Sequence, residues 1–263
     1  MRIALHGATG RMGQAIVRLV HETREAQIVG AIAAVNEVQQ GCDVGEVAGI
    51  GHLGVSVTAD HAVGLLGADI AIDFSAAPAI PALARAVKRA RVALVSGTTG
   101  IDPSGAAALS EAAEVVPVLW APNMSLGIEA VARMARLAVA ALGDEFDVEI
   151  VETHHRQKID APSGTALRLA EAVREARKDL VLGHGREGVT GARKKNELSV
   201  FAIRGGDVIG DHTIHLLGPS ERIEITHRAT QRDLFARGAL RAARWLIGKK
   251  PGRYSLGDLV GLG

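Results

Sequence analysis

The run IALHGATGRMG, residues 3–13, decides the fold. Residues 3–6 form a short apolar stretch that ends at a glycine-rich turn, and apolar residues then follow at helical spacing from Met12 to Val20. A second apolar stretch, rich in β-branched residues, covers 26–34. The order strand, glycine turn, helix, strand predicts a parallel βαβ unit.

The same alternation continues along the chain to residue 120. Apolar strands are expected at 69–74, 92–96 and 115–120, with helices at 78–91 and 105–114 between them. Continuous apolar strands separated by helices are typical of a parallel sheet that is covered on both faces. The first domain is therefore predicted to be an α/β domain of Rossmann type.

The pattern changes after Asn123. Helices are expected at 126–142 and 163–177 and a strand at 146–153, and strand-like runs with short turns follow at 197–204, 208–217 and 221–228. Closely spaced strands predict a smaller α+β domain with a mixed or antiparallel sheet. A last amphipathic helix at 231–247 is expected to return to the first domain, because its apolar stripe needs a surface to cover it. The expected division is a first domain of 1–124 and 235–263 and a second domain of 125–234.

The composition excludes several classes of protein. Of 263 residues, 48% are hydrophobic and 22% charged, and the formal net charge is +1, so a disordered chain or a polyanion-binding protein is not indicated. Aromatic residues make up 3%, too few for stacking on bases. The single cysteine, Cys42, cannot form an intrachain disulfide, and no metal site is expected. Since neither a membrane helix nor a signal peptide is apparent, we expect a cytoplasmic protein with no nucleic-acid or membrane partner.

The glycine turn carries the first functional signal. Its spacing is G-x-x-G-x-x-G, over Gly7, Gly10 and Gly13, rather than the commoner G-x-G-x-x-G. Such a turn lets a pyrophosphate approach the N-terminus of the following helix. Two further loops, 96–100 and 121–125, follow strands of the same expected sheet and therefore lie at its ligand-binding edge. Together the three loops predict a dinucleotide site.

The preference between NADH and NADPH depends on the end of the second strand. NAD-specific proteins usually carry an acid there, but this chain has Ala34 and Val35, and its nearest acid is Glu37. Without a carboxylate to repel a 2′-phosphate, and with Arg11 close by in sequence, we expect NADPH or dual use.

The densest chemistry is HHRQKIDAPSGT, residues 154–165. Four potentially cationic side chains within five residues repel one another unless an anion is bound. Ser163 can cap the next helix, whose first residues Gly164 and Thr165 then offer hydrogen-bond donors to a carboxylate. Hydride delivery to an unsaturated carbon leaves a negative charge, and a histidine or lysine can supply the proton that neutralises it.

The sequence resembles the 4-hydroxy-tetrahydrodipicolinate (dihydrodipicolinate) reductase family over essentially its whole length. The resemblance rests on GRMG (10–13), GTTG (97–100), APNMS (121–125) and above all ETHHRQKIDAPSGTA (152–166). It implies His154 as proton donor and acceptor, Lys158 as proton donor, and His155, Gly164 and Thr165 as ligands of the substrate carboxylates. It also implies that NADPH or NADH is bound by Gly7, Ala8, Thr9, Gly10, Arg11, Met12, Gly97, Thr98, Thr99, Ala121, Pro122, Asn123 and Met124.

The family reaction that the resemblance implies is the NAD(P)H-dependent reduction of (2S,4S)-4-hydroxy-2,3,4,5-tetrahydrodipicolinate, with loss of water, to (S)-2,3,4,5-tetrahydrodipicolinate in lysine and diaminopimelate biosynthesis. A homotetramer formed through the second domain, and a hinge between the domains, are implied as well. The chain departs from the family at Ala34-Val35, where some members have Glu-Arg, and at Gln157, where others have a histidine.

Two other functions fit the sequence less well. An aspartate-semialdehyde dehydrogenase needs a nucleophilic cysteine in its catalytic region, and Cys42 lies elsewhere. A non-catalytic NAD(H)-sensing protein would keep the glycine turn but has no use for His154 and Lys158. The basic run 193–195 is expected to be a solvated loop or a lid over anionic groups, and His212, His215 and His227 to be ordinary strand residues rather than metal ligands.

Overall fold

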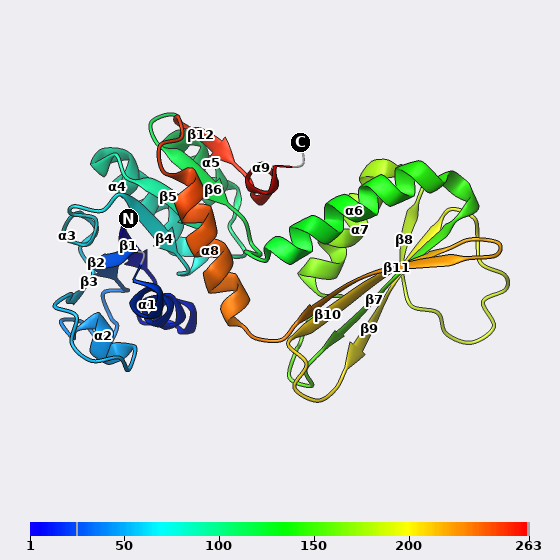
Figure 1. The fold of residues 1–263 in the computed structure, drawn as a ribbon, viewed down its shortest axis with the longest axis horizontal. Coiled ribbons are helices and arrows are strands. Elements are labelled where there is room, and N and C mark those ends of the chain that lie inside the picture. Colours follow the sequence, from blue (N-terminus) through cyan, green and yellow to red (C-terminus); the bar gives the residue numbers. More distant parts are fainter. Residues whose placement is uncertain (25, 262–263) are drawn as a thin grey trace. The chain divides into compact units, whose positions relative to one another are not determined.

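The computed structural model describes residues 1–24 and 26–261, which form two compact units (Figure 1). Unit 1 comprises 1–124 and 233–261, and unit 2 comprises 125–232. Residues 262–263 of the expected first domain lie outside the described residues. In the part of the chain that is described, no helix is both long and apolar enough to span a membrane.

Unit 1 is built on a seven-stranded sheet in the order β12-β6-β5-β4-β1-β2-β3, in which every pair is parallel. This confirms the predicted Rossmann-type sheet. All residues of the two central strands β4 and β5 are buried, as expected for strands that are covered on both faces. The strands are β1 Arg2–His6, β2 Gln27–Ile32, β3 Val57–Thr58, β4 Ile70–Asp73, β5 Ala93–Ser96, β6 Pro117–Trp120 and β12 Gly252–Tyr254.

Two helix pairs pack on this sheet: α4 with α5, and α1 with α8 (Figure 1). Each of the four presents an apolar stripe to the strands; in α4, for example, Leu83 and Val87 are fully buried. Short elements fill the connections. The helices are α1 Arg11–Thr23, α2 Val44–Val47, α3 His61–Gly64, α4 Ile80–Ala90, α5 Pro103–Ala113, α8 Asp233–Leu246 and α9 Leu256–Val260, with a 3₁₀ turn at Ala77–Ala79.

Unit 2 contains a five-stranded sheet in the order β11-β10-β7-β9-β8. β10 is antiparallel to β7 and β11, whereas β9 is parallel to β7 and β8, so the predicted mixed sheet is confirmed. The strands are β7 Asp147–His154, β8 Val181–His184, β9 Glu197–Arg204, β10 Gly210–Leu217 and β11 Arg222–Ala229.

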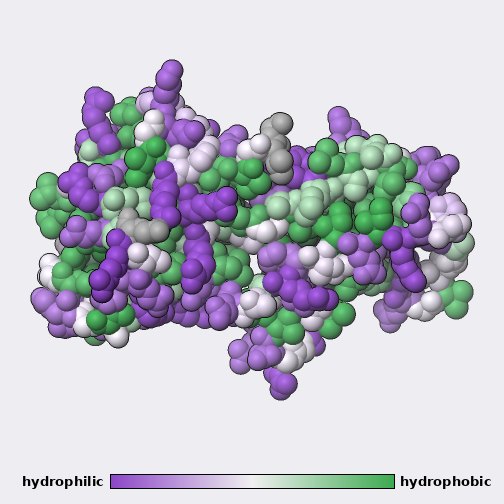
Figure 2. All heavy atoms as spheres, in the orientation of Figure 1, coloured by the Kyte–Doolittle hydropathy of each residue, from purple (hydrophilic) through white to green (hydrophobic). Residues whose placement is uncertain are grey.

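One face of the unit 2 sheet is covered by two helices, α6 Leu126–Leu142 and α7 Gly164–Ala176 (Figure 1). The core lies between them and the alternate strand residues that include Ile150, Val200 and Ile214. A 3₁₀ turn at Gly143–Glu145 joins α6 to β7. Hydrophobic residues also reach the outer surface along α6, where Leu137 is 70% exposed (Figure 2).

The basic run 193–195 is anchored at the beginning of β7. Arg193 donates to Asp147 at 2.6 Å and to Glu149 at 2.7 Å, and Lys195 pairs with Asp144 at 2.7 Å. His154 ends the same strand seven residues after Asp147, roughly 23 Å away at about 3.3 Å per residue. Within the chain, this placement favours the loop interpretation of the run over the lid. Residues 181–184 form an edge strand that the sequence pattern did not predict.

Candidate active site

The three expected dinucleotide loops lie at one edge of the parallel sheet. Gly7–Gly10 follows β1, Gly97–Thr99 follows β5 and Ala121–Met124 follows β6. Because these strands run parallel, their carboxyl ends are at the same edge.

The glycine loop leaves the N-terminus of α1 open. Gly7 has a φ of 78°, and a Cβ atom on Gly13 would lie 2.4 Å from the Gly7 carbonyl oxygen, so neither position tolerates a side chain. Gly10, the N-cap of α1, provides no side-chain cap, and the first turn carries no acid. The first N–H groups of α1 are therefore available to an anion. These features fit the pyrophosphate of NADH or NADPH.

A buried carboxylate connects the loops at this edge. Asp73, the last residue of β4, accepts hydrogen bonds from His6 Nδ1, Ser96 Oγ and Thr98 Oγ1, each at 2.7 Å. The Ser75 N–H also donates to it, at 3.1 Å. Burial alone would raise the pKa of Asp73, but the hydrogen bond from His6 and those from Ser75 and Ser96 outweigh burial and lower the pKa. Asp73 is therefore ionised at neutral pH and holds Thr98, an expected dinucleotide ligand.

Unit 2 has an equivalent carboxylate, Glu152, at the end of β7. It is fully buried and accepts two hydrogen bonds from Arg204, both at 2.8 Å. His154 Nδ1 donates to the same carboxylate at 2.5 Å, and the Ser163 N–H donates at 3.0 Å. Ser163 is the N-cap of α7 and accepts from the Ala166 N–H. One carboxylate thus fixes both the expected catalytic histidine and the start of the expected carboxylate-binding helix.

These contacts define the state of the His154 ring. Burial lowers the pKa of His154, although Glu152 opposes this, and the charge of Lys158 lowers it further. Burial would raise the pKa of Glu152, but the hydrogen bonds from Arg204 and His154 lower it. With Glu152 ionised and Nδ1 as the donor, the lone pair of neutral His154 is on Nε2. A Cβ atom on Gly210 would lie 3.0 Å from Nε2, so the glycine keeps this nitrogen uncovered.

A second buried histidine supports the same network. His212 lies on β10, its ring centroid 5.1 Å from that of His154 in an edge-to-face arrangement, and its Nε2 is 3.2 Å from Ser163 Oγ. Burial and the neighbouring His154 lower the pKa of His212 to about 4. The ring is therefore neutral at neutral pH.

The remaining expected residues surround this network. Lys158 Nζ donates to Asp160 at 2.7 Å, and its charge affects the pKa of His154, so the two groups interact. Gly164 and Thr165 begin α7, and a Cβ atom on Gly164 would meet nothing within 4 Å. The first turn of α7 therefore has open space beside it. No group of three or more His, Cys, Asp or Glu side chains within the described ranges is arranged to hold a metal ion.

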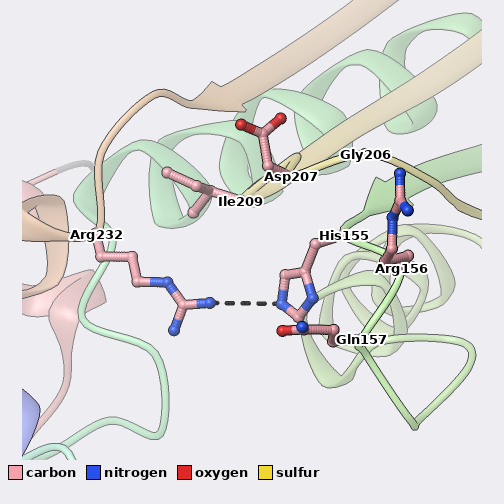
Figure 3. Close-up of a pocket in the computed structure, with 7 residues that line it drawn as sticks. All are labelled: His155, Arg156, Gln157, Gly206, Asp207, Ile209 and Arg232. Atoms are coloured by element: carbon pink, nitrogen blue, oxygen red, sulfur yellow. Dashed lines mark hydrogen bonds between the residues drawn. The ribbon is translucent and has the colours of Figure 1, made fainter.

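His155 faces a cavity of about 510 Å³ on the surface of unit 2 (Figure 3). Arg232 extends from the opposite wall, and its Nη2 lies 3.4 Å from His155 Nε2. A guanidinium group can only donate, so His155 Nε2 is the acceptor in a hydrogen bond between the two groups. The buried Nδ1 of His155 has no hydrogen-bond partner among the described residues. The cavity is lined by His155, Arg156, Gln157, Gly206, Asp207, Ile209 and Arg232.

Sequence reasoning missed several residues of this site: Asp73, Glu152, Arg204, Arg232 and the network role of His212. Arg204 lies 52 residues after Glu152 in the chain, and Arg232 lies 77 residues after His155, so no local spacing connects them. Glu152 did leave a signal. It precedes His154 by two residues in a strand, and residues at that spacing share a face.

Comparison with known proteins agrees with this architecture. Residues 1–124 match the family model described as dihydrodipicolinate reductase, N-terminus, and residues 127–260 match the model of the C-terminus. Proteins named 4-hydroxy-tetrahydrodipicolinate reductase from Anaeromyxobacter dehalogenans (strain 2CP-C) and Myxococcus xanthus (strain DK1622) are 48% and 46% identical, over 99% of this chain and 98% of each relative. A solved structure of dipicolinate-bound dihydrodipicolinate reductase from Paenisporosarcina sp. TG-14 has the same fold, with a TM-score of 0.77 and 24% identity over 97% of both chains. The chain belongs to the dihydrodipicolinate reductase family.

Proposed function

We propose that His154 and Lys158 handle the protons of the family reaction, and that unit 2 binds its dicarboxylate substrate. The reaction is the NAD(P)H-dependent reduction of (2S,4S)-4-hydroxy-2,3,4,5-tetrahydrodipicolinate to (S)-2,3,4,5-tetrahydrodipicolinate with loss of water, a step of lysine and diaminopimelate biosynthesis. Bound NADH or NADPH supplies the hydride. The dinucleotide would be held by the open N-terminus of α1 and by the loops at 97–99 and 121–124.

The observation that carries this proposal is the buried Glu152–His154 hydrogen bond. A neutral imidazole whose Nδ1 proton is held by a carboxylate can exchange protons only through Nε2, so the bond fixes both the tautomer and the orientation of the ring. Lys158, held by Asp160, is the nearby cation that could donate a second proton. A protein that only sensed NAD(H) would have no use for this arrangement.

Two positive regions of unit 2 would bind the substrate carboxylates. One is the first turn of α7, where the N–H groups of Gly164 and Thr165 lie at the positive end of the helix dipole. The other is the cavity in which Arg232 approaches His155 (Figure 3). The Paenisporosarcina relative was solved with dipicolinate, a small dicarboxylate, which supports a ligand of this class.

A coupled assay tests this proposal. The substrate is generated from pyruvate and aspartate semialdehyde by its synthase, and oxidation of NADH and NADPH is followed separately. His154→Gln and Lys158→Ala should each lower turnover sharply and leave dinucleotide binding nearly intact. Near-normal turnover of either variant would show that its assigned proton-transfer role is wrong.

We also propose that the protein is a cytoplasmic homotetramer assembled through unit 2. The helices α6 and α7 cover only one face of the five-stranded sheet. On the opposite face, apolar side chains reach the surface of the single chain, with Ile203 51% and Leu217 37% exposed. Light scattering should give four times the chain mass of 27.4 kDa, and Ile203→Arg should reduce it.

A further inference from the structure

The segment after β2 brings the carboxylate of Glu37 into contact with the glycine loop. β2 ends at Ile32, and a turn closes at 34–37, where the Glu37 N–H donates to the Ala34 carbonyl at 2.9 Å. Gln40 Nε2 donates to the same carbonyl at 2.7 Å, which fixes the turn. Glu37 therefore occupies a defined position beyond the end of the second strand.

The Glu37 carboxylate contacts the glycine loop directly. One oxygen accepts from Thr9 Oγ1 at 3.1 Å, and the other accepts from the Val38 N–H at 3.2 Å. No lysine, arginine or histidine in the described ranges forms an ion pair with Glu37. A carboxylate has about four acceptor positions, so further hydrogen bonds can be accepted here.

In Rossmann-type domains, the acid that selects NADH lies at the end of the second strand, beside the glycine loop, and accepts from the adenosine ribose hydroxyls. Ala34 and Val35 cannot do this, which is why the sequence favours NADPH or dual use. We infer that Glu37, returned by the turn at 34–37, is the ribose-binding acid of this chain and makes it prefer NADH. The inference rests on the proposed dinucleotide site.

The opposing group is Arg11, the first residue of α1. It is exposed and has no acidic partner among the described residues, so it would attract the 2′-phosphate of NADPH. The charges of Glu37 and Arg11 therefore act in opposite directions on a 2′-phosphate. Removing the charge of Glu37 leaves Arg11 unopposed.

The test measures the Kd of NADH and of NADPH by fluorescence titration without substrate, so that it does not depend on turnover. Glu37→Gln keeps the size of the side chain and removes its charge. We expect the wild type to bind NADH more tightly, and the variant to shift the ratio of the two Kd values at least about tenfold towards NADPH, equivalent to about 1.4 kcal/mol. Glu46→Gln, at an exposed acid of the same unit, makes the same change in net charge and should leave the ratio unchanged.

The outcomes separate the two proposals. If both dinucleotides bind the wild type but Glu37→Gln leaves the ratio as it was, or changes it no more than Glu46→Gln, the inference about Glu37 is wrong and the dinucleotide site stands. If Ala34→Asp changes the ratio when Glu37→Gln does not, the ribose lies beside Ala34. If neither dinucleotide binds the wild type, the dinucleotide site itself is wrong, and the inference fails with it.

Discussion

Replacing Glu152 with glutamine isolates the role of its charge. Four donors surround the carboxylate: two from Arg204, one from His154 and one from the Ser163 N–H. An amide offers one acceptor oxygen, and its NH₂ group would face donors. If this NH₂ occupies the position of Oε2, which contacts His154, then His154 Nδ1 must become an acceptor. The ring proton of His154 then moves to Nε2, which is the nitrogen proposed to exchange protons with the substrate.

The structure gives the expected magnitudes. A hydrogen bond to a charged group contributes about 1.5–3 kcal/mol, which corresponds to a loss of about 10- to 150-fold in kcat if it is the orienting bond of His154. Because Arg204 also loses its buried partner, the free energy of unfolding should fall by roughly 3 kcal/mol. Glu152 opposes the lowering of the His154 pKa by burial, so the pKa of His154 falls further in the variant. In a plot of kcat against pH, the limb that reports the titration of His154 therefore moves to lower pH.

The assay is kcat and kcat/KM as functions of pH, together with thermal unfolding. Glu149→Gln is the matched control, because Glu149 is a buried acid of the same strand, β7. Its partners, Arg186 and Arg193, lie towards the end of β7 that is opposite to His154. The control should lose stability without moving the limb. If the pH profile and kcat of Glu152→Gln match those of the control, Glu152 has only a structural role and the reasoning about His154 is refuted.

Three further predictions concern other parts of the site. Asp73→Asn should lower the free energy of unfolding by roughly 3 kcal/mol at neutral pH, measured by chemical denaturation. Because the folded-state pKa of Asp73 is lowered, the stability difference between wild type and variant should shrink as the pH falls below 3.8. A stability difference that did not depend on pH would contradict this prediction. Gly210→Ala should reduce kcat by up to about 100-fold, because its methyl group would crowd His154 Nε2, whereas Gly205→Ala, where a Cβ atom meets nothing within 4 Å, should not. Arg232→Gln should weaken the binding of dipicolinate about tenfold in calorimetry, and should weaken the binding of the monocarboxylate picolinate less. Equal losses of affinity for the two compounds would exclude a carboxylate subsite at Arg232.

The sequence predicted the elements whose pattern is local. The glycine turn at 7–13 and the central strands could be recognised because glycine spacing and apolar runs act within a few residues. β12 was missed, since its three residues gain strand structure only by pairing with β6, more than 130 residues earlier in the chain. The contact between Glu37 and Thr9 could not be predicted for a related reason, because it depends on the turn at 34–37 rather than on the composition at 34–35.

The partners of Asp73 and Glu152 could not be predicted because they lie far from these acids along the chain. Asp73 lies 67 residues from His6 along the chain and contacts it only because β1 and β4 are neighbours. Glu152 and Arg204 likewise meet only because β7 pairs with β9. Such contacts follow from the register of the sheet, which single-sequence patterns do not contain.

Asp73 and Glu152 show the same physical solution in two different sheets. Each is an ionised, buried carboxylate at the end of a strand that has neighbours on both sides, and each gathers donors from an adjacent strand and from a following loop. A carboxylate left in such a place without donors would cost several kcal/mol, so each strongly favours the loop conformation that satisfies it. The loops proposed to bind dinucleotide and substrate are thus ordered before any ligand arrives, and binding does not have to supply the free energy of ordering them. The charge of each acid, rather than its volume, orders the loop. Glutamine and asparagine are therefore the informative replacements, because they remove the charge and nearly keep the volume.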